Sequence, residues 1–158
     1  MKIILKQIVV LIITFQAKMV LKKYNPKIVA VTGSVGKTSA KDAIYNAIST
    51  QHFVRKSKKS FNSEVGLPLT ILNCPNGWSN PFLWLRNIVE GILLILLPNH
   101  YPEWLVLEIG ADRPGDISKM ASWLNTDVVV ITQFSKVPAH VEFFSSPEEV
   151  MKEKASLI

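Results

Sequence analysis

Runs of apolar residues separated by polar turns divide the chain into alternating predicted strands and helices. A β-branched run over 28–31 predicts a buried strand, and apolar residues at 40, 43, 44, 47 and 48 then recur at helical spacing. Further strands are predicted over 52–56, 104–110 and 127–134, with helices ending near residue 73, following Asn80-Pro81, over 117–124 and after Ser146. This alternation predicts an α/β fold, with a mostly parallel sheet and helices on both faces.

The segment before the first strand is apolar but carries several lysines: Lys2, Lys6, Lys18, Lys22 and Lys23. Its uninterrupted apolar part, 8–15, is too short to span a bilayer, and no small-x-small cleavage pattern follows it. We expect an apolar N-terminal helix that acts as a docking segment over 1–25, followed by a domain over 26–158. Contact of this helix with the inner face of the cell membrane stays open.

A glycine-rich turn joins the first strand to its helix, and it reads Thr32-Gly33-Ser34-Val35-Gly36-Lys37-Thr38-Ser39. A strand, Gly-x-x-Gly-Lys-Thr and a helix, in that order, form the context of a phosphate-binding loop. Its backbone N–H groups would close around an anion at the helix N-terminus. We expect Lys37 to reach the outer phosphates and the Thr38 hydroxyl to bind Mg²⁺. Val31 stands where the general pattern has a glycine, and a chance match in a surface turn is the alternative.

Two candidate metal ligands follow later strands. Glu108 lies near the carboxyl end of an otherwise apolar strand, where an unpaired carboxylate is costly. It is predicted to bind a metal or, alternatively, to cap a neighbouring loop. His140 follows the next strand, and ligand and structural roles both stay open. Ligands of open α/β sheets bind beyond the carboxyl ends of the strands, which is where both residues are predicted to lie.

The last predicted helix carries a lysine on its apolar side. Ser146-Pro147-Glu148-Glu149 forms a capping box with proline at the first helical position. One face then holds Lys154 among apolar residues: Val150, Met151, Leu157 and Ile158. A lysine on a buried stripe is unusual, and snorkelling of its amine to the surface is the alternative.

Composition and net charge favour an anionic binding partner but do not distinguish between the kinds of anionic partner. The 158 residues suffice for one domain with a core, and the net charge of +6 favours an anionic partner such as nucleotide phosphates, a membrane surface or nucleic acid. The basic run over 55–59 lacks interleaved aromatic residues, so we interpret it as a solvated loop and expect no nucleic-acid partner. Cys74, the single cysteine, excludes an internal disulfide and is interpreted as a packed or loop residue.

Four segments, in order over 29–158, resemble the central ATP-binding domain of the Mur ligase family. The shortened family loop, Thr-Gly-x-x-Gly-Lys-Thr, matches Thr32 to Thr38 and accounts for Val31. Residues 61–70, 107–117 and 138–146 resemble segments of the D-alanyl-D-alanine-adding branch of that family. The resemblance therefore implies a P-loop-containing Mur ligase central domain, here incomplete.

This resemblance implies a cytoplasmic ligase of peptidoglycan precursor synthesis. ATP would phosphorylate the carboxylate of a UDP-N-acetylmuramoyl-tripeptide, and the amine of D-alanyl-D-alanine would attack the acyl phosphate. Lys37 would hold the outer phosphates, and Thr38 and Glu108 would hold one Mg²⁺. His140 would hold a second Mg²⁺, with Lys154 carbamylated. Asn62 is implied to lie near the γ-phosphate or the acceptor carboxylate.

The chain also departs from the family pattern at both ends. The family has a uridine-binding domain before the loop, where this chain has only residues 1–25, and the chain stops straight after the Lys154 helix. The residues that contact adenine and deliver the amine are absent, so we expect an inactive fragment of an active parent. Two alternatives stay open: a catalytically silent nucleotide-binding remnant, and a related ligase with a different acceptor.

Overall fold

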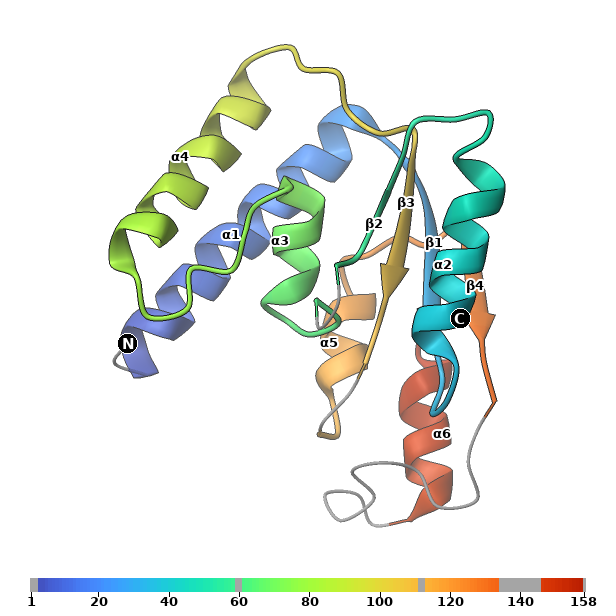
Figure 1. Cartoon of the computed structure of the whole chain (residues 1–158). Helices are drawn as coiled ribbons and strands as arrows, with labels where there is room; N and C mark the ends of the chain where they lie inside the picture. Colours follow the sequence, from blue (N-terminus) through green and yellow to red (C-terminus); the bar gives the residue numbers. More distant parts are fainter. Residues whose placement is uncertain (1–2, 59–60, 111–112, 134–145, 158) are drawn as a thin grey trace.

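The computed structural model describes residues 3–58, 61–110, 113–133 and 146–157. Within them, four parallel strands form one sheet in the order β2-β3-β1-β4, with helices on both faces (Figure 1). The strands are β1 (Lys27–Thr32), β2 (Val54–Lys56), β3 (Trp104–Glu108) and β4 (Val128–Ile131). The predicted α/β fold class, with its parallel sheet, is confirmed.

The central strand, β1, is buried on both faces, as its β-branched sequence predicts. Val29 pairs with Val106 of β3 on one side and with Val128 of β4 on the other. All residues of β1 after Lys27 are buried. Burial on both faces is characteristic of strands in parallel sheets, because helices cover each face.

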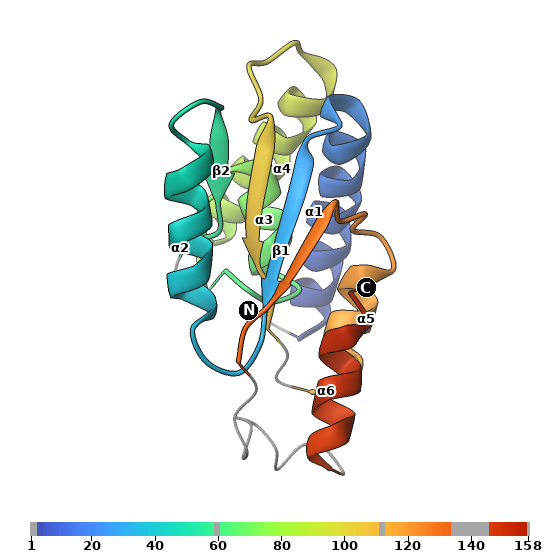
Figure 2. The ribbon, with the colours of Figure 1, turned by 90° about the vertical axis from the view of Figure 1, so that its right-hand side faces the viewer.

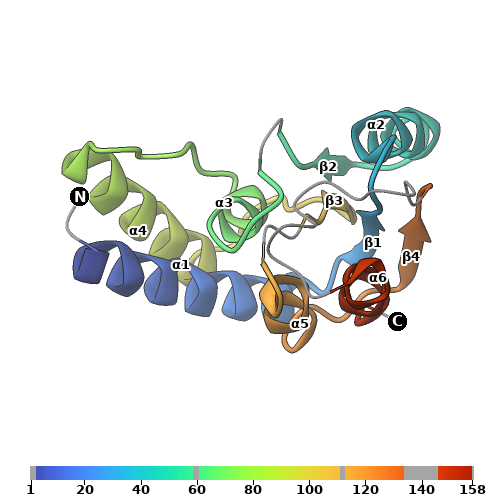
Figure 3. The ribbon, with the colours of Figure 1, turned by 90° about the horizontal axis from the view of Figure 1, so that it is seen from below.

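One face of the sheet is covered, among the described helices, only by α2 (Lys37–Ile48), which lies apart from the other helices in Figures 2 and 3. Its apolar side packs on valines of three strands, and the cluster includes Ala40, Ile44, Ile48, Val29, Val31, Val54 and Val106. The apolar residues of α2 recur at helical spacing, so the sequence predicts which side of this helix packs on the sheet.

The remaining helices lie on the other side of the sheet: α1 (Ile3–Tyr24), α3 (Gly66–Leu72), α4 (Pro81–Leu96), α5 (Asp116–Ala121) and α6 (Pro147–Ala155). They share one larger core, which includes Ile13, Val20, Leu69, Ile71, Leu105, Leu107, Ile117, Met120 and Leu157. Because α1 contributes to this core, it packs as a structural helix of the fold, whatever it docks against besides. The proposed division of the chain at residue 25 stays a prediction.

Helix α4 packs on α1. It begins as predicted, with the Asn80 Oδ1 accepting hydrogen bonds from the backbone N–H groups of Phe82 and Leu83. The Gln16 side chain of α1 donates to the Ile88 carbonyl at 2.8 Å. The two helices run side by side in Figures 1 and 3. Among the described residues, no helix combines the length and apolarity needed to cross a membrane.

Two expectations about side-chain exposure are wrong: Arg55 was expected to be solvated, and Met151 was expected to be buried. Arg55, placed in a solvated loop, instead donates to the Ile71 carbonyl at 2.7 Å and lies over the Tyr101 ring, and burial lowers its pKa. Met151, placed on the buried face of the last helix, is 40% exposed. The buried face of α6 instead holds Val150 and Lys154, whose four-residue spacing puts them on one side of the helix.

Candidate phosphate and metal site

The turn between β1 and α2 depends on its two glycines. Gly36 has φ 84° in the left-handed region that glycine adopts without strain. Gly33 has φ 140°, and a Cβ at that position would lie 2.0 Å from the Thr132 Oγ1. The strand, glycine turn and helix predicted from the sequence are therefore all present, and β4 packs closely against the turn.

Several groups of this turn can interact with an anion. The first backbone N–H groups of α2, beginning at Lys37, have no carbonyl partner within the helix and carry the positive end of its dipole. Lys37 lies across the turn, its Nζ donating to the Gly33 carbonyl at 3.1 Å. The N–H groups of Ser34 and Val35 donate to the Gln133 carbonyl at 3.1 and 3.2 Å, which ties the turn to the end of β4. Phosphate binding here stays a prediction.

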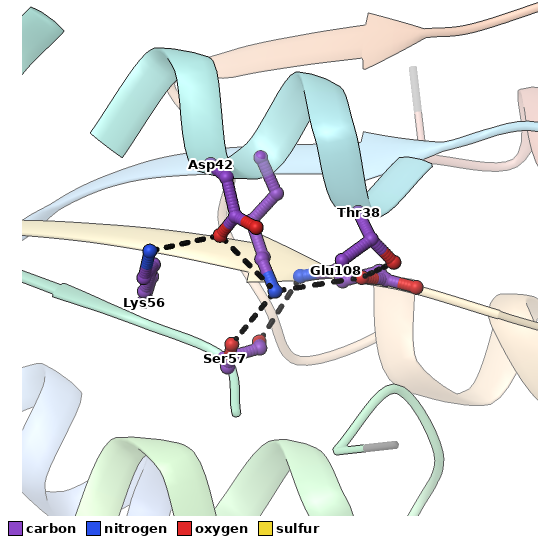
Figure 4. Close-up of polar contacts among 6 residues, drawn as sticks. Thr38, Asp42, Lys56, Ser57 and Glu108 are labelled. Atoms are coloured by element: carbon purple, nitrogen blue, oxygen red, sulfur yellow. Dashed lines mark hydrogen bonds and ion pairs between the residues drawn. The ribbon is translucent and has the colours of Figure 1, made fainter. Parts of the chain in front are cut away.

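Glu108 lies beside this turn because β3 pairs in register with β1, which sets Glu108 opposite Val31. The Glu108 side chain is only 9% exposed. Its Oε2 accepts a hydrogen bond from the Thr38 Oγ1 at 2.9 Å (Figure 4). Two residues 70 positions apart, each predicted as a metal ligand, thus meet at the carboxyl edge of the sheet.

The Thr38 hydroxyl and the Glu108 carboxylate fit a magnesium ion by chemistry and by spacing. Mg²⁺ prefers oxygen ligands at about 2.0–2.1 Å in an octahedron, which sets adjacent ligands about 2.9 Å apart. The two oxygens are separated by 2.9 Å. Within the described part of the chain, no three His, Cys, Asp or Glu side chains gather as a metal cluster. The second magnesium ion was assigned to His140, which lies outside the described residues.

A buried lysine that the sequence analysis did not single out supports Glu108. Lys41, 3% exposed, places its Nζ 3.7 Å from the Glu108 Oε2 and donates to the Ser57 carbonyl at 3.0 Å. The Ser57 Oγ in turn accepts from the Glu108 backbone N–H at 3.0 Å. Figure 4 shows these contacts joining α2, β3 and the segment after β2. Lys41 follows Thr38 by three residues, so helical spacing already directs it toward the same side of α2.

The network continues to the surface through Asp42, which lies 3.6 Å from the Lys41 Nζ and forms a 2.8 Å ion pair with Lys56 (Figure 4). The hydrogen bond from Lys56, helped by the charge of Lys41, holds the pKa of the Asp42 carboxyl below its usual value. A chain of alternating charges therefore connects β2 to the carboxylate at the turn.

Lys154 approaches the turn from α6. The residue is 6% exposed, and its Nζ donates to the Ser34 Oγ at 3.1 Å. Burial, followed by the nearby charge of Lys37, lowers the pKa of the Lys154 amine. The amine therefore points into the molecule, toward the glycine turn, and does not snorkel to the surface.

Asn62 borders a cavity next to this edge of the sheet. Its carbonyl accepts from the Gly110 N–H at 2.9 Å, and a Cβ at Gly110 would lie 3.0 Å from the Asn62 Nδ2. The cavity has a volume of about 540 Å³ and is lined by cationic, anionic and polar side chains, among them Lys6, Glu64, Arg113, Asp116 and Lys119. Asn62 can therefore face a polar ligand held beside β3.

The structure thus gathers Lys37, Thr38, Glu108 and Lys154 around one turn, while Asn62 borders the adjoining cavity. Open parallel sheets bind ligands at the carboxyl ends of their strands. The fold and this cluster define a parallel α/β protein with its candidate ligand site at that edge.

Comparison with known proteins finds similarity to the Mur ligases. Residues 89–158 match the Mur ligase middle domain. The chain is 30% identical over 142 residues to UDP-N-acetylmuramoyl-tripeptide--D-alanyl-D-alanine ligase of Bacillus subtilis, and the match covers 90% of this chain and 25% of that relative. The corresponding ligase of Borreliella burgdorferi is 29% identical over 142 residues, with the same coverage of 90% and 25%.

Solved structures agree with these relatives. The MurF ligase from Thermotoga maritima in complex with ADP matches with a TM-score of 0.67 and 30% identity, covering 95% of this chain and 29% of that one. MurF from Acinetobacter baumannii matches in fold with a TM-score of 0.67, at 19% identity over 92% of this chain and 26% of that one. The match of residues 89–158 to the Mur ligase middle domain agrees with the resemblance seen in the sequence. It spans about a quarter of the length of the curated relatives that it matches.

Proposed function

We propose that this chain forms the nucleotide-binding part of an ATP-dependent ligase that adds D-alanyl-D-alanine to UDP-N-acetylmuramoyl-tripeptide. The relatives carry this activity in their names, and one similar structure was solved with ADP. Because the chain spans a quarter of their length, the complete reaction is proposed for the natural protein that carries this sequence. The observation that carries the proposal is the Thr38–Glu108 contact at the mouth of the glycine turn.

The proposed reaction needs positive charge around the phosphates. The γ-phosphate and the acceptor carboxylate are both anionic, and phosphoryl transfer requires them to be held in line. Lys37 would bind the outer phosphates, aided by the N-terminal amides of α2, residues 37–39. Thr32 to Gly36 would contribute the rest of the cradle. The Lys154 side chain already reaches the turn, where its Nζ donates to the Ser34 Oγ.

Thr38 and Glu108 would hold Mg²⁺, which when bound neutralises phosphate charge. Lys41 would keep the Glu108 carboxylate oriented toward the Thr38 hydroxyl. We further propose that His140 contributes to a second Mg²⁺ and that Lys154 is carbamylated. Carbamylation would replace the Lys154 ammonium by a carboxylate, and its inward position beside the turn suits that exchange.

The cavity beside Asn62 would take the acceptor. Three cationic side chains, Lys6, Arg113 and Lys119, outnumber the two acidic ones in its lining, Glu64 and Asp116. The proposed acceptor carries carboxylates and a diphosphate. The Asn62 amide can donate a hydrogen bond to the carboxylate that is to be phosphorylated. ATP is a cytoplasmic substrate, so we propose that the protein acts there, at the inner face of the cell membrane.

Nucleotide binding is the first test, and it uses the purified chain. Binding of a fluorescent ATP analogue with Mg²⁺ is compared for the wild type, Lys37→Ala and the matched control Lys152→Ala, an exposed lysine of α6. We expect Lys37→Ala to weaken binding about 10- to 100-fold, because charge-assisted hydrogen bonds contribute about 1.5–3 kcal/mol. Equal affinity of Lys37→Ala and Lys152→Ala would refute the role of the turn.

Turnover is the second test, and it uses the natural protein that carries this sequence. Phosphate release from ATP should require both UDP-N-acetylmuramoyl-tripeptide and D-alanyl-D-alanine, and Glu108→Gln should abolish it. ATP binding without release would instead identify a catalytically silent nucleotide-binding protein. Release with a different acceptor or amine would identify a related ligase of other specificity.

A further inference from the structure

Helix α4 presents an apolar face that no described residue covers. Six of its side chains are each at least 44% exposed: Phe82, Leu85, Val89, Ile92, Leu93 and Leu96. Their three- and four-residue spacing places them on one side of the helix, along its whole length. The opposite side, with Trp84, Asn87 and Gly91, is buried against the protein. Patches of this kind on soluble domains mark interaction surfaces.

Helix α1 carries a second exposed apolar stripe. Ile8, Leu11, Phe15 and Met19 follow one another at three- and four-residue spacing and are 38% to 70% exposed. The buried residues of α1 lie on the other side and belong to the core. Helix α1 thus packs one side into the core and exposes apolar residues on its other side.

The two exposed faces adjoin along the contact between the helices. A Cβ at Gly91 would lie 2.5 Å from the Gln16 Oε1, so these positions mark the line of closest approach. Ile92 follows Gly91 directly, and Met19 lies one helical turn after Gln16. The outward faces therefore meet beside this line, forming the α1/α4 apolar surface.

Lys23 fixes the two helices to each other at the end of this surface. Its Nζ donates to three terminal carbonyls of α4, those of Leu94 at 3.0 Å, Ile95 at 2.9 Å and Leu97 at 2.6 Å. The Tyr24 hydroxyl also donates to the Leu94 carbonyl at 3.0 Å. The helix pair can consequently act as one rigid element.

The charges around the α1/α4 apolar surface are positive. Helix α1 contains no acidic residue but has lysines at 6, 18, 22 and 23. Lys18 and Lys22 are exposed and border the stripe, where long stems can lie along lipid and place their amines at the headgroups. The one acid of α4, Glu90, is ion-paired with Arg86 at 2.7 Å.

We propose that the α1/α4 apolar surface docks this protein on an anionic lipid bilayer, with both helices lying in the plane of the interface. The proposal goes beyond the proposed enzymatic function and does not depend on it. Helix faces with exposed apolar side chains and lysines beside them bind at the interface of anionic bilayers in this manner. Because the other sides of α1 and α4 are packed into the core, the helices meet the bilayer along one face only. The main contact is made by α4, well outside the lysine-bearing N-terminal segment.

Vesicle co-sedimentation of the purified chain without nucleotide tests the proposal. The probes are vesicles of phosphatidylcholine alone and of phosphatidylcholine mixed with phosphatidylglycerol. We expect binding to the mixed vesicles, weaker binding to the neutral ones, and loss of binding as salt rises. Leu85→Gln/Leu96→Gln, at two exposed positions that the core does not need, should reduce partitioning at least about tenfold.

Matched variants separate the surface from general effects. Val128→Gln changes a comparably exposed apolar residue on β4, and Lys152→Glu reverses an exposed charge on α6; both should bind as the wild type does. Lys18→Glu/Lys22→Glu should lower binding to mixed vesicles several-fold and leave binding to neutral ones unchanged. Circular dichroism checks that each variant is folded.

Three outcomes would overturn the proposal. The first is a wild-type chain that stays in the supernatant with both vesicles. The second is a folded Leu85→Gln/Leu96→Gln variant that binds as the wild type does. The third is a wild-type dimer in solution that the same variant converts to a monomer, with no vesicle binding, which would assign the surface to a second copy of this chain. Because no nucleotide is used, none of these results bears on the ATP-binding test.

Discussion

Replacing Lys41 by methionine removes the buried cation behind the candidate metal ligand while keeping most of the side-chain volume. The Lys41 Nζ lies 3.7 Å from the Glu108 Oε2. At an effective dielectric constant of about 20, two unit charges at this separation attract by about 4.5 kcal/mol. Removing one partner of a buried pair costs about 3–5 kcal/mol, because the other charge is left behind. Glu108 keeps its hydrogen bond from Thr38, so we expect Lys41→Met to lower the free energy of unfolding by about 3 kcal/mol.

Urea unfolding followed by circular dichroism measures this loss, with Lys152→Met as the matched control, for which we expect less than about 0.5 kcal/mol. Glu108→Gln completes a double-mutant cycle. In its presence Lys41→Met should cost only about 1 kcal/mol, giving a coupling of about 2 kcal/mol. A Lys41→Met loss below about 1 kcal/mol, or strictly additive effects, would refute the view that the two buried charges depend on each other.

Two further predictions concern groups away from the turn. The Glu153 carboxylate accepts from the N–H groups of Ile117 at 2.7 Å and Ser118 at 3.0 Å; although burial raises its pKa, these bonds lower it by more. A carboxyl whose pKa is lower in the folded chain than its unfolded value of 4.5 stabilises the fold at pH values above 4.5. This stabilisation is lost as the pH falls below that value. Glu153→Gln should therefore lower the free energy of unfolding by about 1 kcal/mol at neutral pH in urea titrations, with the difference shrinking below pH 4.5; a pH-independent difference would contradict this. Burial, then the nearby Glu90 charge, raises the pKa of the Cys74 thiol from 9.0 to about 12, which lowers its thiolate fraction about a thousandfold. Iodoacetamide should label Cys74 at least that much more slowly in the folded chain than in urea, and comparable rates would show an accessible thiol.

Local sequence patterns determined much of the fold. The β-branched run of β1, the proline after Asn80 and the capping box at Ser146 each encode their element within a few residues. The structure places all three elements as expected, including the hydrogen bond from the Glu149 N–H to the Ser146 Oγ. Short sequence patterns were sufficient to predict these elements, because helix caps depend on local backbone geometry and the periodic apolar residues mark the buried face.

The supporting contacts of the site were not readable in the same way. The Ser57 carbonyl accepts a hydrogen bond from the Lys41 side chain. The two residues come together because β2 pairs with β3. Arg55 belonged to a basic run typical of a solvated loop, yet the carbonyl of Ile71 and the ring of Tyr101 enclose it. Such contacts join residues that are far apart in the sequence, and the spacing of apolar residues along the chain does not predict them. The binding roles of all the candidate site residues stay predictions: Lys37, Thr38, Asn62, Glu108, His140 and Lys154.

The strand order has a consequence for synthesis on the ribosome. Strand β1, one of the two inner strands of the sheet, is made before both of its neighbours, which contain Val106 and Val128. At about 5–20 residues per second, Val128 is polymerised about 5–20 s after Val29, its partner in the sheet. During that interval the nascent chain exposes the unpaired edges of a strand rich in valine, the kind of segment that chaperones bind. Maturation of this protein should accordingly be sensitive to chaperone supply, and more so than for a fold whose central strand is translated last.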